Sequence, residues 1–457
     1  MMRAIVLAGS ASGAGKTVAA MGFILAGRAR GLVVRAAKVG PDFIDAAYLE
    51  EASAAPCANL DVWMLGQCGV DTLLRRIEED EPYFLVIEGA MGLFDGGLGS
   101  TAALAESLAL PIVLIVSAKG VGESIAALAR GYLIEKPSLT FAGLLASHVG
   151  SPRHAALVDA ALSPLAREFG IPYLGSLVRA GAPSLPSRHL GLVSVTESGL
   201  NFETLRIWFE EHCDCERILP KPRRKPGSEP QGGAAGRRFF AGRGRSFDIT
   251  IAIACDEAFS FCYADLPALF AELGCETVFF SPLHDTHIPA CQGIVLPGGY
   301  PECYASTLSE NWAMRASFAC ARDRDVPIYA ECGGMLALFS AYWVNGLRYP
   351  MFGLLPGCAR LKDSCQALGY REARVLWPQL GDVRVRGHEF HYAVIEQTDD
   401  LAISHPLWQL FDREGRDLGP SGIVYRRVAA SWLHLPPEGG RAFFSAWTAY
   451  LRECARA

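Results

Sequence analysis

The sequence predicts an α/β protein with two parallel-sheet domains joined by a linker. At 457 residues, the chain is long enough for two or three domains. Short apolar runs alternate with helical patterns in both halves, which is typical of crossover units on a parallel sheet. Between the halves, residues 217–245 carry nine basic residues and one acidic residue among many Pro and Gly. We therefore predict a first domain at residues 1–212, a linker at 213–247 and a second domain at 248–457.

The expected strands follow from apolar runs bounded by turn residues. In the first half they are Arg3–Ala8, Phe84–Ile87, Ile112–Val116 and Ala142–Ala146, with a helix beginning at about Lys16. In the second half they are Ile249–Ala254, Thr277–Phe280, Gly293–Leu296 and Pro327–Ala330. The segment between them cannot bury a core, so we expect a flexible linker; a basic arm for nucleic acid is the alternative.

Composition excludes several classes of protein. The formal net charge of -6 argues against general nucleic-acid binding. The 14 cysteines are scattered, without the spacing of a disulfide framework or a zinc finger. No run of about 20 apolar residues predicts a membrane span, and Met1–Ala8 is too short for a signal peptide. We expect a cytoplasmic protein with reduced thiols.

A phosphate-binding loop lies between the first predicted strand and helix. Residues 9–17 read GSASGAGKT. Gly13 and Gly15 let backbone N–H groups turn toward phosphate oxygens, Lys16 places a cation on the β- and γ-phosphates, and Thr17 can hold Mg²⁺. The usual first glycine is Ser10 here, with Gly9 one residue earlier. The strand–loop–helix context favours nucleotide binding over a Gly-rich turn without ligand.

Carboxylates follow two further predicted strands. The stretch KVGPDFID contains Asp42 and Asp45, and the stretch EGAMGLFDG contains Glu88 and Asp95. Ligands of open parallel sheets bind at the carboxyl ends of the strands, and carboxylates there suit Mg²⁺. Each acid alone would be assigned to a cap or a turn; their combination beside a phosphate loop favours a metal or catalytic role.

The second half contains a candidate cysteine nucleophile. PIYAECGGML, with Cys332 at its centre, predicts a strand, a sharp turn and a helix. Such an elbow exposes a nucleophile, the helix N-terminus favours a thiolate, and the glycine Gly333 admits the tight geometry. Backbone N–H groups of Gly298 and Gly299, after another strand, could stabilise an oxyanion.

A histidine must act as the base for Cys332. His434, at the end of another apolar run, is our candidate. It would take the thiol proton and return it to leaving ammonia. The stretch RGHEFHY at 386–392 is not HExxH, so zinc-protease chemistry is disfavoured; we expect a structural or substrate-lining loop there.

With these motifs placed, the chain resembles the cobyrinic acid a,c-diamide synthase family, which includes the hydrogenobyrinic acid and nickel-sirohydrochlorin enzymes. The resemblance covers nearly the whole chain except the linker. The specific stretches are KVGPDFID, EGAMGLFDG, LPSRHLG at 185–191, LPGGYPE at 296–302, YAECGG at 329–334, LGYREA at 368–373 and RGHEFHY. It implies a dethiobiotin-synthetase-like first domain and a class I glutamine amidotransferase-like second domain.

The resemblance also implies an activity. ATP with Mg²⁺ phosphorylates the c-acetate and then the a-acetate of a corrinoid or related tetrapyrrole, and ammonia from L-glutamine displaces phosphate. The phosphate and metal residues would be Lys16, Thr17, Glu88 and Asp95. Asp42 and Asp45 would be catalytic or substrate-placing carboxylates. A homodimer is the family-based expectation, with no membrane or nucleic-acid partner.

Several points stay open from the sequence. Cobyrinate, hydrogenobyrinate and nickel-sirohydrochlorin carry the same two acetates, so the macrocycle is not identified. Relatives often carry an Asn, similar to an adenine contact, where this chain has Ser147, and a second His where it has Pro436. The third member of the Cys–His site is therefore not identified. The alternatives are a cobyric acid synthase and, in another class, a P-loop partitioning-type nucleotide switch.

Overall fold

The computed structural model describes residues 3–78, 83–183, 187–188, 191–192, 195–221, 247–396 and 404–456. These residues divide into two compact units, one ending at residue 221 and one beginning at residue 247. Most of the expected linker, residues 222–246, lies outside the described residues.

A seven-stranded sheet forms the centre of the first unit, in the order β3-β2-β4-β1-β5-β6-β7. All of its neighbouring strands are parallel. The strands are β1 (Arg3–Gly9), β2 (Val34–Val39), β3 (Cys57–Leu60), β4 (Phe84–Glu88), β5 (Ile112–Ser117), β6 (Phe141–Val149) and β7 (Tyr173–Val178). The four strands predicted in this half are confirmed.

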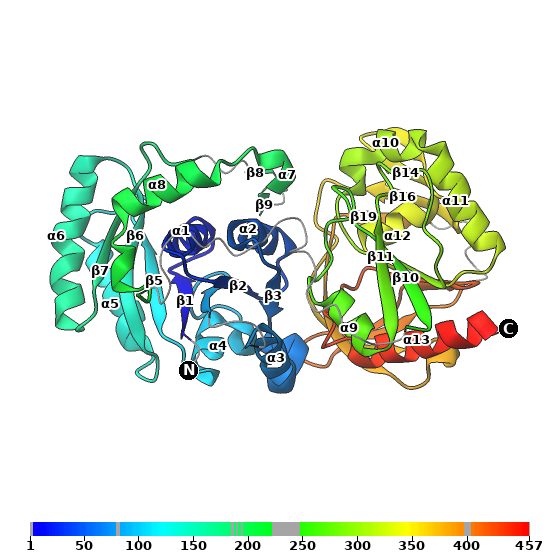
Figure 1. Ribbon diagram of the computed structural model, residues 1–457, viewed down its shortest axis with the longest axis horizontal. Coiled ribbons are helices and arrows are strands. Elements are labelled where there is room, and N and C mark those ends of the chain that lie inside the picture. Colours follow the sequence, from blue (N-terminus) through cyan, green and yellow to red (C-terminus); the bar gives the residue numbers. More distant parts are fainter. Residues whose placement is uncertain are drawn as a thin grey trace. The chain divides into compact units, whose positions relative to one another are not determined.

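Helices cover both faces of this sheet, as Figure 1 shows. They are α1 (Lys16–Ala29), α2 (Phe43–Ser53), α3 (Val62–Glu78), α4 (Thr101–Ser107), α5 (Ile125–Glu135), α6 (Pro152–Glu168), α7 (Val195–Ser198) and α8 (Phe202–His212), with 3-10 turns at Gly97–Gly99 and Cys215–Arg217. Of the LPSRHLG stretch, only the main chain of three residues is described, in the short strands β8 (Ser187–Arg188) and β9 (Gly191–Leu192).

Helix α1 carries the phosphate loop and is held tightly against α8. A Cβ atom added to Gly22 of α1 would lie 2.3 Å from the ring of Phe209 of α8, so only glycine permits this approach. The Phe209 ring also meets Phe23 edge-on, with ring centroids 5.1 Å apart. This packing fixes α1, and with it the end of the loop, over the centre of the sheet.

The first unit continues past residue 212, where the linker was expected to begin. Cys213, Cys215 and Leu219 are buried in the same hydrophobic core as α1 and α8. Gly175 of β7 explains the close fit, because a Cβ there would lie 2.4 Å from the main-chain oxygen of His212. The chain therefore leaves this unit only after Leu219.

The second unit is built on a six-stranded sheet in the order β11-β10-β12-β13-β23-β22. Its strands are β10 (Ile249–Ala254), β11 (Cys275–Phe280), β12 (Gly293–Leu296), β13 (Ile328–Glu331), β22 (Ile423–Tyr425) and β23 (Val428–Ser431). All neighbours are parallel except β22 and β23. This sheet confirms the four strands predicted in the second half and, with the first unit, the α/β class.

Two hydrophobic cores lie on opposite faces of this sheet. Alternate strand residues face one core with α9 and α13, and the others face the core with α11 and α12. Figure 1 shows α13, in red, apart from α10 and α11. The helices are α9 (Leu266–Glu272), α10 (Ala305–Glu310), α11 (Trp312–Asp323), α12 (Gly333–Leu338) and α13 (Arg441–Arg456), with 3-10 turns at Pro301–Tyr304 and Pro378–Leu380.

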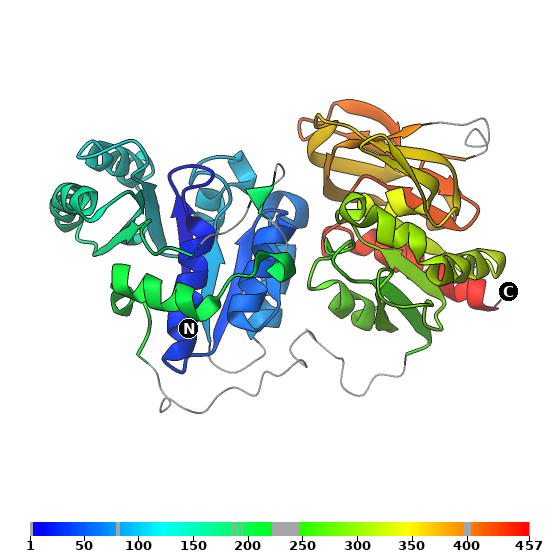
Figure 2. The ribbon, with the colours of Figure 1, turned by 90° about the horizontal axis from the view of Figure 1, so that it is seen from above.

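Two further four-stranded sheets extend the second unit, and Figure 2 shows these strands, yellow to orange, as a separate layer. They comprise β14 (Phe339–Val344), β15 (Leu347–Pro350), β16 (Leu355–Leu361), β17 (Ala367–Val375), β18 (Arg384–His391), β19 (Ala393–Glu396), β20 (Trp408–Phe411) and β21 (Asp417–Ser421). The prediction of a loop at RGHEFHY is wrong. Most of this stretch belongs to β18, which pairs with β17 over eight residues.

Among the described residues, none of the helices combines the length and the apolar character that crossing a bilayer requires.

Candidate active sites

The loop between β1 and α1 has the geometry of a phosphate cradle. Gly13 and Gly15 have φ of 69° and 86°, a region that favours glycine. The Nζ atom of Lys16 donates to the main-chain oxygens of Met91, at 2.6 Å, and Ala11, at 3.1 Å. These carbonyls hold the ammonium group over the loop, at the end of α1 where backbone N–H groups point outward.

Ser147 lies directly beside this loop. Its hydroxyl donates to the main-chain oxygen of Ala14 at 2.6 Å, and the residue is buried. A Cβ on Gly15 would lie 3.4 Å from the Cβ of Ser147. Ser147 therefore supports the loop itself, whichever base the site selects.

Behind the loop, Glu88 joins the end of β4 to α1 and β2. Its Oε1 accepts hydrogen bonds from the hydroxyl of Thr17 at 2.8 Å and from Nζ of Lys38 at 2.9 Å. The strand register places Lys38 directly opposite Glu88. Lys38 also pairs with Asp45, with Nζ 2.8 Å from Oδ2. The structure thus brings together three of the predicted residues, Thr17, Glu88 and Asp45. Glu88 binds Thr17 directly and is linked to Asp45 by Lys38, which was not singled out from the sequence.

Burial and charge determine the protonation of this group. Burial raises the pKa of Glu88 to about 7, against the opposing effect of Lys38. Burial alone would lower the pKa of Lys38, but the charges of Glu88 and Asp45 outweigh it and raise that pKa. Lys16 has a lowered pKa, because of burial first and then the charge of Lys38.

The remaining two predicted acids, Asp42 and Asp95, have exposed side chains, and each accepts a main-chain hydrogen bond in its own turn. Asp42 is the N-cap of α2 and accepts a hydrogen bond from the main-chain N of Asp45 at 2.8 Å. Asp95 accepts one from the main-chain N of Gly92 at 2.9 Å. Their catalytic and metal-binding roles stay predictions.

We expect Lys38→Met to destabilise the first unit, because it leaves two carboxylates without their cation. Breaking a buried ion pair costs about 3–5 kcal/mol of stability. The fraction of molecules in which the first unit is opened should therefore rise by a factor of about a hundred or more. The buried Cys57, on the neighbouring strand β3, reports that opening. Peptide-resolved alkylation of Cys57 should accelerate accordingly, while that of the buried Cys275 in the second unit stays unchanged.

The Lys38→Met effect should depend on pH in one direction. Burial has already raised the pKa of Glu88 to about 7, and loss of Lys38 raises it further. A raised carboxyl pKa contributes stability at low pH that is lost as pH rises. The ratio of mutant to wild-type alkylation rates should therefore be larger at pH 8 than at about pH 5.5. A ratio that is equal at both pH values would contradict the assigned Lys38–Glu88 pair.

In the second unit, Cys332 lies at a sharp elbow between β13 and α12. Its φ of 44° is outside the usual range for a residue with a side chain. The main-chain N of Cys332 donates to the oxygen of Ser431 at 2.7 Å. A Cβ on Gly333 would lie 2.6 Å from the oxygen of Gly299, and one on Gly334 would lie 2.3 Å from that of Leu296. The two glycines therefore allow the elbow to pack against the neighbouring turn.

The imidazole of His434 is buried and interacts electrostatically with the thiol of Cys332. Its Nδ1 lies 3.5 Å from Oε2 of Glu331. Burial alone would lower the pKa of His434, but the interactions with Cys332 and Glu331 outweigh it and raise that pKa. The structure thus brings the predicted Cys332 and His434 together, with the pKa of the imidazole raised by these surroundings.

The turn that contains Gly298 and Gly299 approaches this pair closely. A Cβ on Gly298 would lie 2.3 Å from Cε1 of His434, and one on Gly299 would lie 2.1 Å from the main-chain oxygen of Ala258. The absence of a side chain at Gly298 leaves room for the imidazole of His434, and its absence at Gly299 lets the turn pack against Ala258. The oxyanion role of their N–H groups stays a prediction.

Two histidines of β18 complete the surroundings of His434. The ring of His388 stacks on that of His434 with centroids 4.9 Å apart, and their main chains form an antiparallel bridge. The ring of His391 stacks on Trp432 at 3.8 Å. Burial lowers the pKa of His388 well below its usual value and that of His391 to about 4. Both rings are therefore neutral near pH 7, unlike His434.

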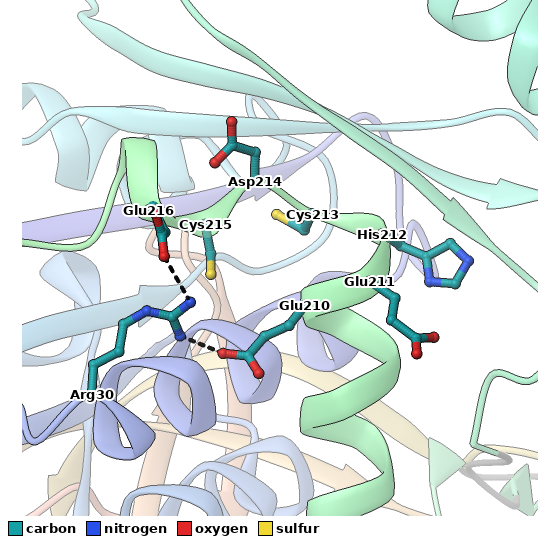
Figure 3. A pocket seen from close by; sticks show the side chains of 8 residues that line it. All are labelled: Arg30, Glu210, Glu211, His212, Cys213, Asp214, Cys215 and Glu216. Atoms are coloured by element: carbon teal, nitrogen blue, oxygen red, sulfur yellow. Dashed lines mark hydrogen bonds and ion pairs between the residues drawn. The ribbon is translucent and has the colours of Figure 1, made fainter. Parts of the chain in front are cut away.

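A surface hollow of the first unit, drawn in Figure 3, is separate from this chemistry. It is lined by Arg30 and residues 210–216. Arg30 is engaged by Glu210 and by Glu216, and Cys213 and Cys215 belong to the hydrophobic core. Across the described parts of the chain, no group of three or more His, Cys, Asp or Glu side chains is arranged to hold a metal ion. The Cys213–Cys215 pair thus has a packing role.

Comparison with known proteins matches both units to families. Residues 5–193 match the CobQ/CobB/MinD/ParA nucleotide binding domain, and residues 250–442 match the CobB/CobQ-like glutamine amidotransferase domain.

Similarity to curated proteins extends over nearly the whole chain. A cobyrinate a,c-diamide synthase of Syntrophotalea carbinolica is 39% identical over 458 residues, which cover 96% of this chain and 97% of that protein. A hydrogenobyrinate a,c-diamide synthase of Brucella suis is 37% identical over 449 residues, with 96% and 100% covered. A cobyrinate a,c-diamide synthase of Listeria innocua is 34% identical, with 95% and 96% covered.

Proposed function

The chain belongs to the family of cobyrinate and hydrogenobyrinate a,c-diamide synthases, and from this membership we propose its reaction. It amidates the a- and c-acetate carboxylates of cobyrinate or hydrogenobyrinate in cobalamin biosynthesis. The reaction uses ATP and ammonia derived from glutamine. The observation that carries the proposal is the presence, in one chain, of a Cys332–His434 pair in the second unit and a phosphate loop with Lys16 in the first. A partitioning-type nucleotide switch does not require a Cys–His pair.

The second unit would release ammonia. The thiolate of Cys332 attacks the side-chain carboxamide carbon of glutamine, and protonated His434 gives its proton to the leaving ammonia. Water then attacks the thioester, His434 accepts a proton from it, and glutamate leaves with restoration of the thiol pair. We propose that N–H groups of Gly298, Gly299 and Gly333 stabilise the tetrahedral oxyanion.

The first unit would activate the carboxylate. The substrate carboxylate attacks the γ-phosphorus of ATP, ADP leaves, and ammonia then displaces phosphate from the acyl phosphate to form the amide. The protein supplies mainly placement and charge neutralisation. We propose that Lys16 neutralises the phosphates and that Asp42 and Asp45 place the acetate, with Asp45 oriented by Lys38.

The residues behind the loop fit a magnesium ion. The buried Oε2 of Glu88 has no hydrogen-bond partner among the described residues, while Oε1 holds the hydroxyl of Thr17. A carboxylate oxygen beside a loop hydroxyl suits Mg²⁺, which takes its other ligands from phosphates and water. Thr17 and Glu88, with Asp95, would hold the ion, which supplies neutralisation of phosphate charge when bound.

The substrate is tested by offering purified protein cobyrinate, hydrogenobyrinate and nickel-sirohydrochlorin in parallel, with ATP, Mg²⁺ and glutamine. We expect mass spectrometry to detect an a,c-diamide from cobyrinate or hydrogenobyrinate, with a monoamide as intermediate. If nickel-sirohydrochlorin alone gave a diamide, the proposed reaction would stand, but its substrate would be nickel-sirohydrochlorin. Absence of product from all three, with folded protein that binds ATP, would contradict the proposal.

Two finer expectations accompany this function. ATP and glutamine are cytoplasmic metabolites, and we propose a cytoplasmic location on that basis. A homodimer is testable by sedimentation of the purified full-length chain.

A further inference from the structure

The carboxylate of Glu331 faces the buried ring of His434 within the second unit. Both side chains are almost fully buried, with His434 2% and Glu331 6% exposed, and Nδ1 of the ring lies 3.5 Å from Oε2 of the carboxylate. We propose that Glu331 is the positioning residue for His434, the third member of the Cys332 site. This inference rests on the proposed glutamine chemistry of Cys332.

Glu331 is itself held in place from two sides. Its Oε1 accepts a hydrogen bond from the hydroxyl of Tyr329 at 2.8 Å and one from the main-chain N of Leu435 at 3.1 Å. Leu435 directly follows His434, so one carboxylate binds the main chain beyond the histidine with one oxygen and faces the ring with the other. The pairing of Glu331 with Ser431 in the parallel register of β13 and β23 brings these segments together.

This arrangement orients the ring for its reaction. A carboxylate 3.5 Å from Nδ1 favours a proton on that nitrogen, which leaves Nε2 for the thiol. When the Cys332 proton moves to Nε2, the carboxylate stabilises the imidazolium and remains ionised itself. The protons balance, because the one gained by His434 later leaves with ammonia.

The other groups discussed around His434 cannot act as its carboxylate partner. His388 and His391 of β18 also act on its charge, but burial and the charge of His434 keep both neutral. Position 436, two residues beyond His434, is a proline and offers no side-chain acceptor. The carboxylate comes instead from the residue immediately before the nucleophile.

Glu331→Gln tests the charge, because glutamine keeps the shape and an acceptor oxygen. We expect glutamine hydrolysis to slow by roughly 10²–10⁴-fold. The pH at which iodoacetamide alkylation of Cys332 reaches half of its maximum should rise by about one unit, since the imidazolium loses its stabilising carboxylate. Amidation driven by free ammonia should be unchanged, because it does not use this site.

Tyr329→Phe is the matched control, since it removes one hydrogen bond from Glu331 but no charge. The alkylation midpoint should stay within a few tenths of a pH unit of wild type. Slower glutamine hydrolysis in Glu331→Gln without a moved midpoint would overturn the proposal and leave only a packing role. The midpoint is measurable even if the chain uses no glutamine, so failure of the proposed function is recognised separately.

A measurement on the wild-type chain covers the case in which Glu331→Gln does not fold. Nitrogen-15 NMR of labelled histidine, with His434→Asn for assignment, should show His434 protonated at Nδ1 throughout the pH range in which the chain is folded. An Nδ1 atom without a proton at high pH would overturn the assignment to Glu331.

Discussion

Replacement of Cys332 by Ala should abolish diamide formation from glutamine and leave diamide formation from free ammonia intact. The thiolate forms the covalent intermediate, and no neighbouring group can replace it, so we expect a loss of at least about a thousandfold. Alanine keeps the Cβ atom at the elbow and removes only the sulfur. The measurement is mass spectrometry of products formed with ATP, Mg²⁺ and either nitrogen source.

Cys320→Ala serves as the control for Cys332→Ala. Cys320 is an exposed cysteine on α11 of the same unit, outside the site, and its loss should leave both activities at wild-type levels. Loss of ammonia-driven activity in a folded Cys332→Ala protein would mean that ammonia release and carboxylate activation are not separate functions of the two units.

Replacement of Lys16 by Ala should stop amidation with either nitrogen source. Nζ of Lys16 is held over the loop by the oxygens of Ala11 and Met91, and the proposed reaction requires its charge on the transferring phosphoryl group. Loss of one such cation costs about 10³-fold or more in rate. Ammonia is the informative nitrogen source, because it bypasses Cys332.

Two controls accompany the prediction for Lys16→Ala. Lys136→Ala removes an exposed lysine that pairs with Glu106, and its activity should equal that of wild type. Alkylation of Cys332 should be unchanged in Lys16→Ala, which shows that the second unit is intact. Normal ammonia-driven rates in Lys16→Ala would eliminate the phosphate loop as the site of carboxylate activation.

The parts of each site that sequence predicts are those made by consecutive residues. The loop ending in Lys16 and Thr17 and the elbow at Cys332 each combine a strand, a turn and a helix start within a few positions. Local spacing there dictates the backbone, because glycine is needed where φ is positive or where chains approach closely. The eight predicted strands follow from the same kind of local pattern and are confirmed.

What escaped prediction depends on register between distant strands. Lys38 is one of seven lysines in the sequence, and only its pairing opposite Glu88 reveals a buried cation between carboxylates. The available signal was a lysine near the end of a strand whose other residues, apart from Arg35, are apolar. Likewise, the third member of the Cys332 site was not identified from the sequence, and only the structure shows that Glu331 faces the ring of His434.

The stretch that contains His388 shows the same limit. Its polar residues were taken for a loop, yet β18 pairs with β17 and buries His388 against His434. Burial alternates only over the first four residues of β18, and the ring partner of His388 comes from a segment more than 40 residues away in the sequence. Propensity alone does not identify such partners.

The sequence by itself determined the α/β class, the phosphate loop, the cysteine elbow and the family, because each depends on short-range spacing that one chain segment carries. Only the tertiary structure decided which charges meet: Lys38 with Glu88 and Asp45, and Glu331 with His434. The reason is physical. Buried ionisable groups must be compensated by partners in space, and the folded register of the sheets, which no local pattern encodes, selects those partners.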